Sequence, residues 1–173
     1  DEFVAGLRSS AERVFTQYET DPQYRIVHDD LSDMRRVTSG ATYQKGSWVL
    51  HMLRSQVGDE VFWRGIREYY ARYMNGNATT TDFRTVMEEA SGLDLGLFFE
   101  QWLYNGGNPR LEGWWDYDAS TRAVRIEINQ TQTAGPTFEL PLEIGIHFDA
   151  TSLPGTIHDV VVDARSHRFV IPV

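Results

Sequence analysis

Hydrophobic residues recur three and four positions apart along the chain up to about residue 105, the spacing that places them on one face of a helix. Glycine-rich and asparagine-rich stops interrupt this pattern, at Gly58, at residues 75–77 and at Gly92. A polar stretch at 20–40 is typical of a loop, with one helical turn at 31–35. The pattern therefore predicts about five helices: from the N-terminus to about residue 18, and at about 42–57, 60–73, 80–90 and 95–103.

The starts of three of these helices carry residues that favour an N-cap. Asp59 is expected to cap the third helix, a hydroxyl in 79–81 the fourth and Asp94 the fifth. The aromatic cluster around Phe98 and Trp102 is interpreted as hydrophobic core.

After Pro109 the period changes from 3.6 to 2, which predicts strands. Apolar residues alternate at 124–128 and over 138–148, where Pro141 favours an edge position or a bulge. About five strands are expected, separated by polar turns. The order of elements predicts an α+β fold in two segregated parts. We expect residues 1–108 to form an all-α helical subdomain, and residues 109–173 to form a small antiparallel β-sandwich that is incomplete at its C-terminus.

Composition excludes several classes of protein. With 16 basic and 25 acidic residues the formal charge is −9, which disfavours nucleic acid as a partner. There is no cysteine, so disulfides and thiolate metal sites are excluded. No apolar run approaches the roughly 20 residues of a membrane span. The compartment is left open, with a slight lean to a periplasmic or secreted bacterial protein.

Most candidate chemistry is absent from the sequence. No two histidines have the spacing of a helical zinc pair, and no serine-nucleophile or phosphate-loop motif occurs. The remaining candidates for a chemical role are residues 43–46. A tyrosine in the first turn of a helix can hold its hydroxyl in a cleft, where a phenol donates one directed hydrogen bond to a developing negative charge. Gly46 inside a helix suggests a close backbone neighbour. The alternative is a half-buried Tyr43 with no function.

Residues 43–53, YQKGSWVLHML, resemble the Y-x-K-G-a-x-v-L-x-m-L segment of the aminopeptidase N family of zinc metallopeptidases, the gluzincins. The similarity continues in register through residues 58–62 (GDEVF), 77–83 (NATTTDF), 98–103 (FFEQWL) and 107–109 (GNP). Together the matches cover about residues 40–110, and their common order makes the resemblance much more specific than any single match.

The resemblance implies a thermolysin-like catalytic domain, with residues 1–108 as its C-terminal helical part. It implies that Tyr43 donates a hydrogen bond to the tetrahedral intermediate formed when zinc-activated water attacks a peptide bond. The family's zinc motif H-E-x-x-H and its third glutamate ligand are missing here. We therefore expect zinc in a longer parent enzyme and no metal bound by this chain. The expected partners are a peptide substrate and the N-terminal half of the catalytic domain.

Two origins of the chain are compatible with the missing motif. It is either an excised piece of a larger enzyme, inactive alone, or a stand-alone protein that lost its catalytic half; the abrupt ends favour the first. A second functional class is a non-catalytic binding or scaffolding module. In that case the β-sandwich contacts a protein or glycan through Trp114-Trp115, one of which points away from the sheet core in a regular strand.

Overall fold

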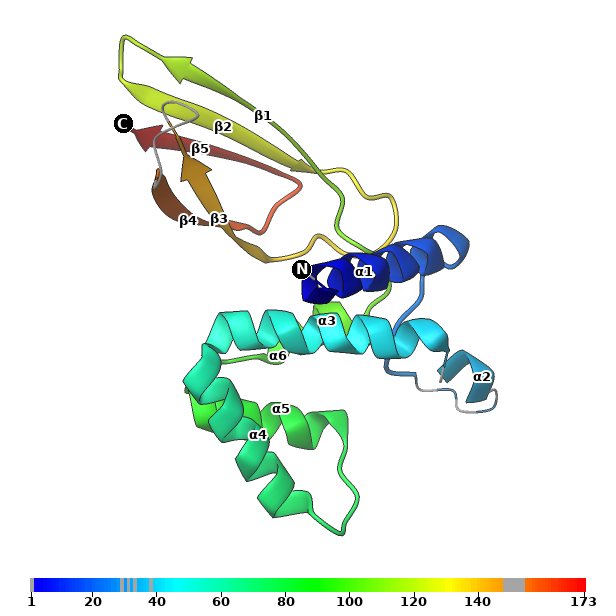
Figure 1. The fold of residues 1–173 in the computed structure, drawn as a ribbon. Helices are drawn as coiled ribbons and strands as arrows, with labels where there is room; N and C mark the ends of the chain where they lie inside the picture. Colours follow the sequence, from blue (N-terminus) through cyan, green and yellow to red (C-terminus); the bar gives the residue numbers. More distant parts are fainter. Residues whose placement is uncertain (1, 29, 31, 33, 38, 148–154) are drawn as a thin grey trace. The chain divides into compact units, whose positions relative to one another are not determined.

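The computed structural model describes residues 2–28, 30, 32, 34–37, 39–147 and 155–173. The chain divides into two compact units, Asp1–Gly107 and Asn108–Val173 (Figure 1). The first unit is helical and the second consists of antiparallel strands, as the change of hydrophobic period predicts. The α+β fold class with segregated parts is therefore confirmed.

Four helices of more than ten residues form the body of the helical unit, and shorter helical segments join or extend them. The elements are α1 (Glu2–Thr20), α2 (Met34–Val37), α3 (Gly40–Val57), α4 (Asp59–Tyr73), α5 (Thr80–Ser91), α6 (Gly96–Phe99) and the π-helix η1 (Glu100–Tyr104). The turn expected at 31–35 lies partly outside the described residues, and α2 is the helical turn found beside it.

The helix ends show which capping predictions hold. Thr79 caps α5 in a full capping box with Asp82, and Gly92 ends α5 in the left-handed region at a φ of 72°. The prediction for Asp59 is wrong, because Gly58 is the N-cap and Asp59 is already the first residue of α4. Its carboxylate instead accepts hydrogen bonds from the Arg54 guanidinium at 2.7 and 2.6 Å, so the last turn of α3 engages it.

The fifth predicted helix is split into α6 and η1. Leu95 occupies the N-cap, and Asp94 accepts a hydrogen bond from the Gly96 N–H at 2.8 Å. From Glu100 the helix widens into the five-residue π-helix. The sequence predicts one continuous helix here, because the spacing of apolar residues does not distinguish α from π geometry over a single turn.

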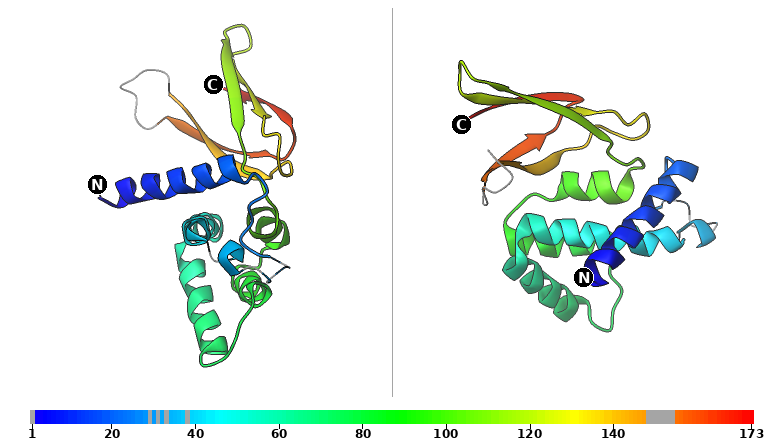
Figure 2. Two further views of the ribbon diagram at one scale, coloured as in Figure 1. Left: turned by 90° about the vertical axis from the view of Figure 1, so that its right-hand side faces the viewer. Right: turned by 45° about the horizontal axis from the view of Figure 1, so that its top comes forward.

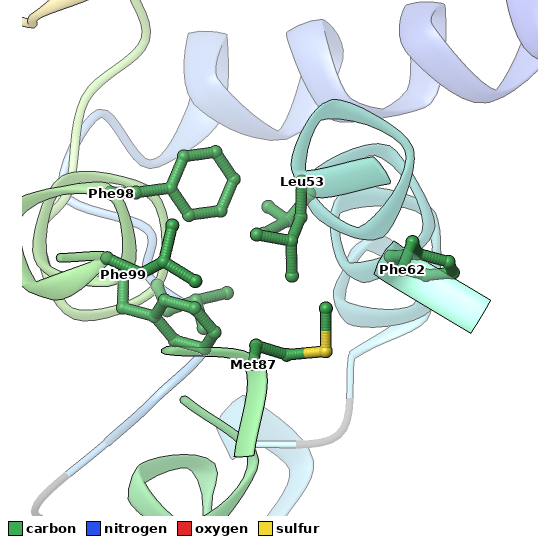
Figure 3. Packing of buried hydrophobic residues seen from close by; sticks show 8 residues of the cluster. Leu53, Phe62, Met87, Phe98 and Phe99 are labelled. Atoms are coloured by element: carbon green, nitrogen blue, oxygen red, sulfur yellow. The ribbon is translucent and has the colours of Figure 1, made fainter. Parts of the chain in front are cut away.

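The core of the helical unit joins α3, α4, α5 and α6 (Figure 3). Leu53, Phe62, Met87 and Phe99 meet there, and Met87 directs its sulfur between α3 and α4. Gly65 of α4 allows α5 to approach closely, since a Cβ at this position would lie 2.5 Å from the Met87 sulfur. This contact makes a glycine in the middle of α4 understandable despite its cost to helix stability.

α1 crosses α3, and the segment that follows it is fixed to the end of η1 (Figure 2). The backbone N–H groups of Ile26 and Val27 both donate to the Leu103 carbonyl, at 3.1 and 3.0 Å. A Cβ at Gly106 would lie 2.7 Å from backbone atoms of Gln23, so only glycine fits there. Residues 23–27 are thus held against the end of η1 and the glycine that follows it.

The second unit has two antiparallel sheets, one of three strands in the order β1-β2-β5 and one formed by β3 and β4. The strands are β1 (Leu111–Asp118), β2 (Ala123–Gln130), β3 (Leu140–Ile146), β4 (Thr156–Val162) and β5 (Ser166–Pro172). Among the described strands β3 pairs only with β4, which gives Pro141 the predicted edge strand. Phe148, included in the expected strand, lies outside the described residues.

The two sheets share a small hydrophobic core. Val124 of β2, Ile146 of β3 and Ile171 of β5 are its buried members. Beside it, the buried side chain of Gln130 accepts from the Phe138 N–H at 2.9 Å and donates to the Phe138 carbonyl at 2.7 Å. Gln130 therefore pairs with Phe138 as a neighbouring strand would, and fixes the chain that leads into β3.

Candidate functional site

Tyr43, the one catalytic residue predicted from the sequence, lies in the first turn of α3. Its side chain is 75% exposed, so it is not the half-buried tyrosine of the alternative interpretation. In this position the phenol O–H is available as a hydrogen-bond donor to a bound molecule.

A cluster of three hydroxyl groups anchors the turn that carries Tyr43. The Tyr24 hydroxyl and Thr42 Oγ1 are hydrogen-bonded at 2.8 Å, and Ser39 Oγ donates to the Tyr24 oxygen at 3.3 Å. Thr42 Oγ1 also donates to the Val37 carbonyl at 3.2 Å. Because Tyr24 is itself buried, these bonds tie the start of α3 to the interior of the helical unit.

Lys45, two residues after Tyr43, points into the interior, and only 4% of it is exposed. Its ammonium nitrogen lies 5.2 Å from the centre of the Tyr18 ring and 5.8 Å from that of Tyr24, within the range of cation–π attraction. Burial lowers the pKa of Lys45 to about 8. Burial also raises the pKa of Tyr18 far above its ordinary value, with Tyr24 and Asp21 adding to the effect.

A hollow between α1 and α3 opens beside Tyr43. It has a volume of about 390 Å³, and Tyr43, Gln44 and Ser47 line it from α3. The residues that line it from α1 are Gly6, Ser9, Ser10 and Arg13. The exposed phenol therefore stands at the edge of a polar depression that can hold part of a small molecule.

Gly46 has no close neighbour among the described residues, because nothing lies within 4 Å of a Cβ built there. The expectation of a close backbone contact is therefore wrong within this structure. The residues that the structure describes also contain no group of three histidine, cysteine or acidic side chains that could hold a metal ion. Within these residues no helix is long and apolar enough to span a bilayer.

The burial of Lys45 was not predicted from the sequence. A separation of two residues rotates a side chain by about 200° around a helix, so Tyr43 and Lys45 had to face nearly opposite directions. Because charged residues are rarely internal, residue type alone favours burial of the Tyr43 face, the opposite of what the structure shows. The partners Tyr18 and Tyr24 lie at a distance in the sequence that no local pattern connects to α3.

Comparison with known proteins places these features among peptidases. The family model described as the peptidase family M1 domain matches residues 9–102. Aminopeptidase N of Streptomyces lividans is 35% identical over 118 residues, which are 66% of this chain and 14% of that protein. Aminopeptidase N of Escherichia coli is 32% identical over 108 residues, 62% of this chain and 12% of that one.

A solved structure shares the fold. The crystal structure of Legionella pneumophila aminopeptidase A in complex with aspartic acid matches with a TM-score of 0.72 and 18% identity. The match covers 88% of this chain and 18% of that chain. The chain thus spans less than a fifth of the length of these relatives.

Proposed function

The chain belongs to peptidase family M1, and from this premise we propose that it works as part of a longer, zinc-dependent aminopeptidase in which Tyr43 stabilises the transition state. The observation that carries the proposal is the exposed phenol at the start of α3, within the Y-x-K-G segment. The substrate class is a peptide with a free amino terminus. Residues 1–108 contribute the C-terminal helical part of the catalytic domain, and residues 109–173 the β-sandwich that follows it.

The role of Tyr43 follows from the chemistry of peptide hydrolysis. When water adds to the peptide carbonyl, negative charge develops on the carbonyl oxygen, and a fixed hydrogen-bond donor stabilises that charge more than the neutral ground state. The Tyr43 hydroxyl is such a donor, because its helix turn is anchored through Thr42 and Tyr24 while its own oxygen is free to meet a substrate. It neither takes nor gives up a proton in this step.

The described residues do not fit a metal centre of their own. The family is zinc-dependent in general, so the metal ligands of the longer enzyme are supplied by residues outside this chain. Residues 1–173 alone are accordingly hydrolytically silent, and they depend on the remainder of the catalytic domain as their partner.

The proposal is tested on the longer protein that contains this chain. We expect it to release the amino-terminal residue from aminoacyl anilides and peptides, to lose this activity when zinc is chelated, and to leave N-acetylated copies of the same peptides intact. The 173-residue chain is the matched control, and no turnover is expected from it with or without added zinc. Failure of the longer protein to cleave any free-amino-terminus peptide, or stoichiometric tight zinc binding by the short chain, contradicts the proposal.

A second candidate function rests on the exposed aromatic residues of β1. Trp114 is 52% and Trp115 is 70% exposed, so both neighbouring rings are accessible although they point to opposite faces of the strand. Exposed tryptophans are typical of surfaces that bind proteins or sugars. The β-strand unit is therefore an alternative non-catalytic binding module. Glycan arrays and protein capture with wild type and Trp115→Ala test it, and the absence of any ligand that depends on Trp115 removes it.

A further inference from the structure

The hollow beside Tyr43 continues along the boundary between α1 and α3. A second hollow of about 330 Å³ is lined by residues of the same two helices, and Arg13 and Gln44 line both. The two hollows therefore adjoin at these side chains and form one polar trough, in which Tyr43 lines one hollow and Gly40 the other. Both helices belong to the helical unit, where α1 crosses α3 (Figure 2).

The trough is lined almost entirely by small or uncharged polar residues. They are Gly6, Ser9, Ser10, Thr16, Gln17 and Thr20 of α1, and Gly40, Ala41, Tyr43, Gln44 and Ser47 of α3. Arg13 is the single charged side chain in this lining. Hydroxyl and amide groups of this kind suit the backbone of a bound peptide better than an apolar ligand.

Within the described residues the charge of Arg13 is not balanced by a carboxylate. Arg54, Arg72 and Arg125 each bind a carboxylate, whereas Arg13 has no ion pair within the part of the chain that the structure describes. The trough thus offers one cation, the Arg13 guanidinium, to a ligand.

We propose that this trough binds the carboxylate-bearing part of a peptide substrate, with Arg13 as the partner of the carboxylate. This inference rests on the function proposed above, in which the scissile carbonyl lies at the Tyr43 hydroxyl. A guanidinium pairs with a carboxylate through two parallel N–H···O bonds, which orients the ligand as well as attracting it. Arg13 is a specificity residue and takes no part in bond cleavage.

The carboxylate can come from two sources, the C-terminus of a short peptide or an acidic side chain. Four substrates of the longer protein separate these sources: a neutral dipeptide, its C-terminal amide, and two dipeptide amides that differ only by aspartate or asparagine as second residue. kcat/KM is measured for each with wild type, Arg13→Gln and Arg13→Lys. Arg8→Gln is the matched control, since Arg8 is also exposed on α1 and lines neither hollow.

We expect wild type to favour one carboxylate substrate over its amide partner by about tenfold, mainly through KM. Arg13→Gln should bring this ratio close to one, Arg13→Lys should retain part of it, and Arg8→Gln should keep it. A preference for the free dipeptide identifies the C-terminal carboxylate, and a preference for aspartate identifies the side chain. Equal kcat/KM for acid and amide in wild type, or a preference that survives Arg13→Gln, overturns the inference.

The outcome is distinguishable from failure of the proposed function. If the longer protein cleaves no peptide, the hydrolytic function fails, and the same substrate pairs are then measured as ligands by calorimetry with wild type and Arg13→Gln. The trough is supported as a carboxylate site if wild type binds each carboxylate ligand more tightly than its amide and Arg13→Gln does not. Binding that does not depend on the carboxylate or on Arg13 contradicts it.

Discussion

Replacing Lys45 with methionine should stabilise the helical unit, although it removes the only lysine of the chain. The substitution keeps a flexible side chain of similar length and removes the buried ammonium group. Because burial lowers the pKa of Lys45 from 10.5 to about 8, the protonated side chain costs the folded state about 3 kcal/mol. The cation–π contacts with the Tyr18 and Tyr24 rings belong to this same balance, because they act on the protonated group. We expect Lys45→Met to recover part of the cost, about 1–2 kcal/mol at pH 7.

The pH dependence of this difference has a definite sign. Below pH 8 Lys45 is protonated in both the folded and the unfolded chain, so the full cost applies. Between pH 8 and 10.5 the folded chain has released the proton and the unfolded chain still holds it, so wild-type stability rises by up to about 1.4 kcal/mol per pH unit. The advantage of Lys45→Met should therefore shrink from pH 8 upward. Lys45→Arg keeps its charge and should show no such rise.

The assay must report on the helical unit alone. All four methionines of the chain lie in it, so urea unfolding followed by the NMR signals of ¹³C-labelled methionine methyl groups observes this unit and not the strands. Wild type, Lys45→Met and Lys45→Arg are compared at pH 7, 8 and 9. A Lys45→Met variant that is less stable than wild type at pH 7, or a stability difference that is the same at all three pH values, would refute a destabilising buried ammonium group.

Further substitutions test the backbone contacts and caps of the helical unit. Gly106→Ala should cost about 2 kcal/mol in urea unfolding, because the new Cβ meets the backbone of Gln23 at 2.7 Å. Gly46→Ala, where a Cβ meets nothing within 4 Å, should stabilise α3 by about 1 kcal/mol, and a loss of stability there would contradict open space at this position. Thr79→Ala breaks the capping box with Asp82 and should lower the free energy of unfolding by about 1 kcal/mol, whereas an unchanged value would show that the box contributes nothing.

Features that depend on neighbouring residues in the sequence were predictable. Thr79 with Asp82 and then Gly92 predict the start and end of α5, because caps act within one turn of the helix. The alternation around Pro141 likewise predicts β3. The prediction for Asp59 was wrong because its ion pair with Arg54 depends on how α3 and α4 meet. Capping preferences do not include this contact.

The site was predictable only in part. Tyr43 was found through its position in a helix turn and the motif around it, and its exposure agrees with a hydroxyl held outward. The trough and Arg13 could not be predicted, because α1 and α3 are separated by a loop whose length does not determine where the helices cross. The aromatic surroundings of Lys45 have the same origin in tertiary packing.

The most direct test of the central claim is Tyr43→Phe in the longer protein, with kcat and zinc content measured together. The substitution removes one hydroxyl from an exposed side chain, so the fold and the bound metal should be unchanged. Loss of a donor to a developing oxyanion typically lowers kcat by about 100-fold or more. The account predicts that fall in kcat at constant zinc content, and a kcat equal to that of wild type would contradict it.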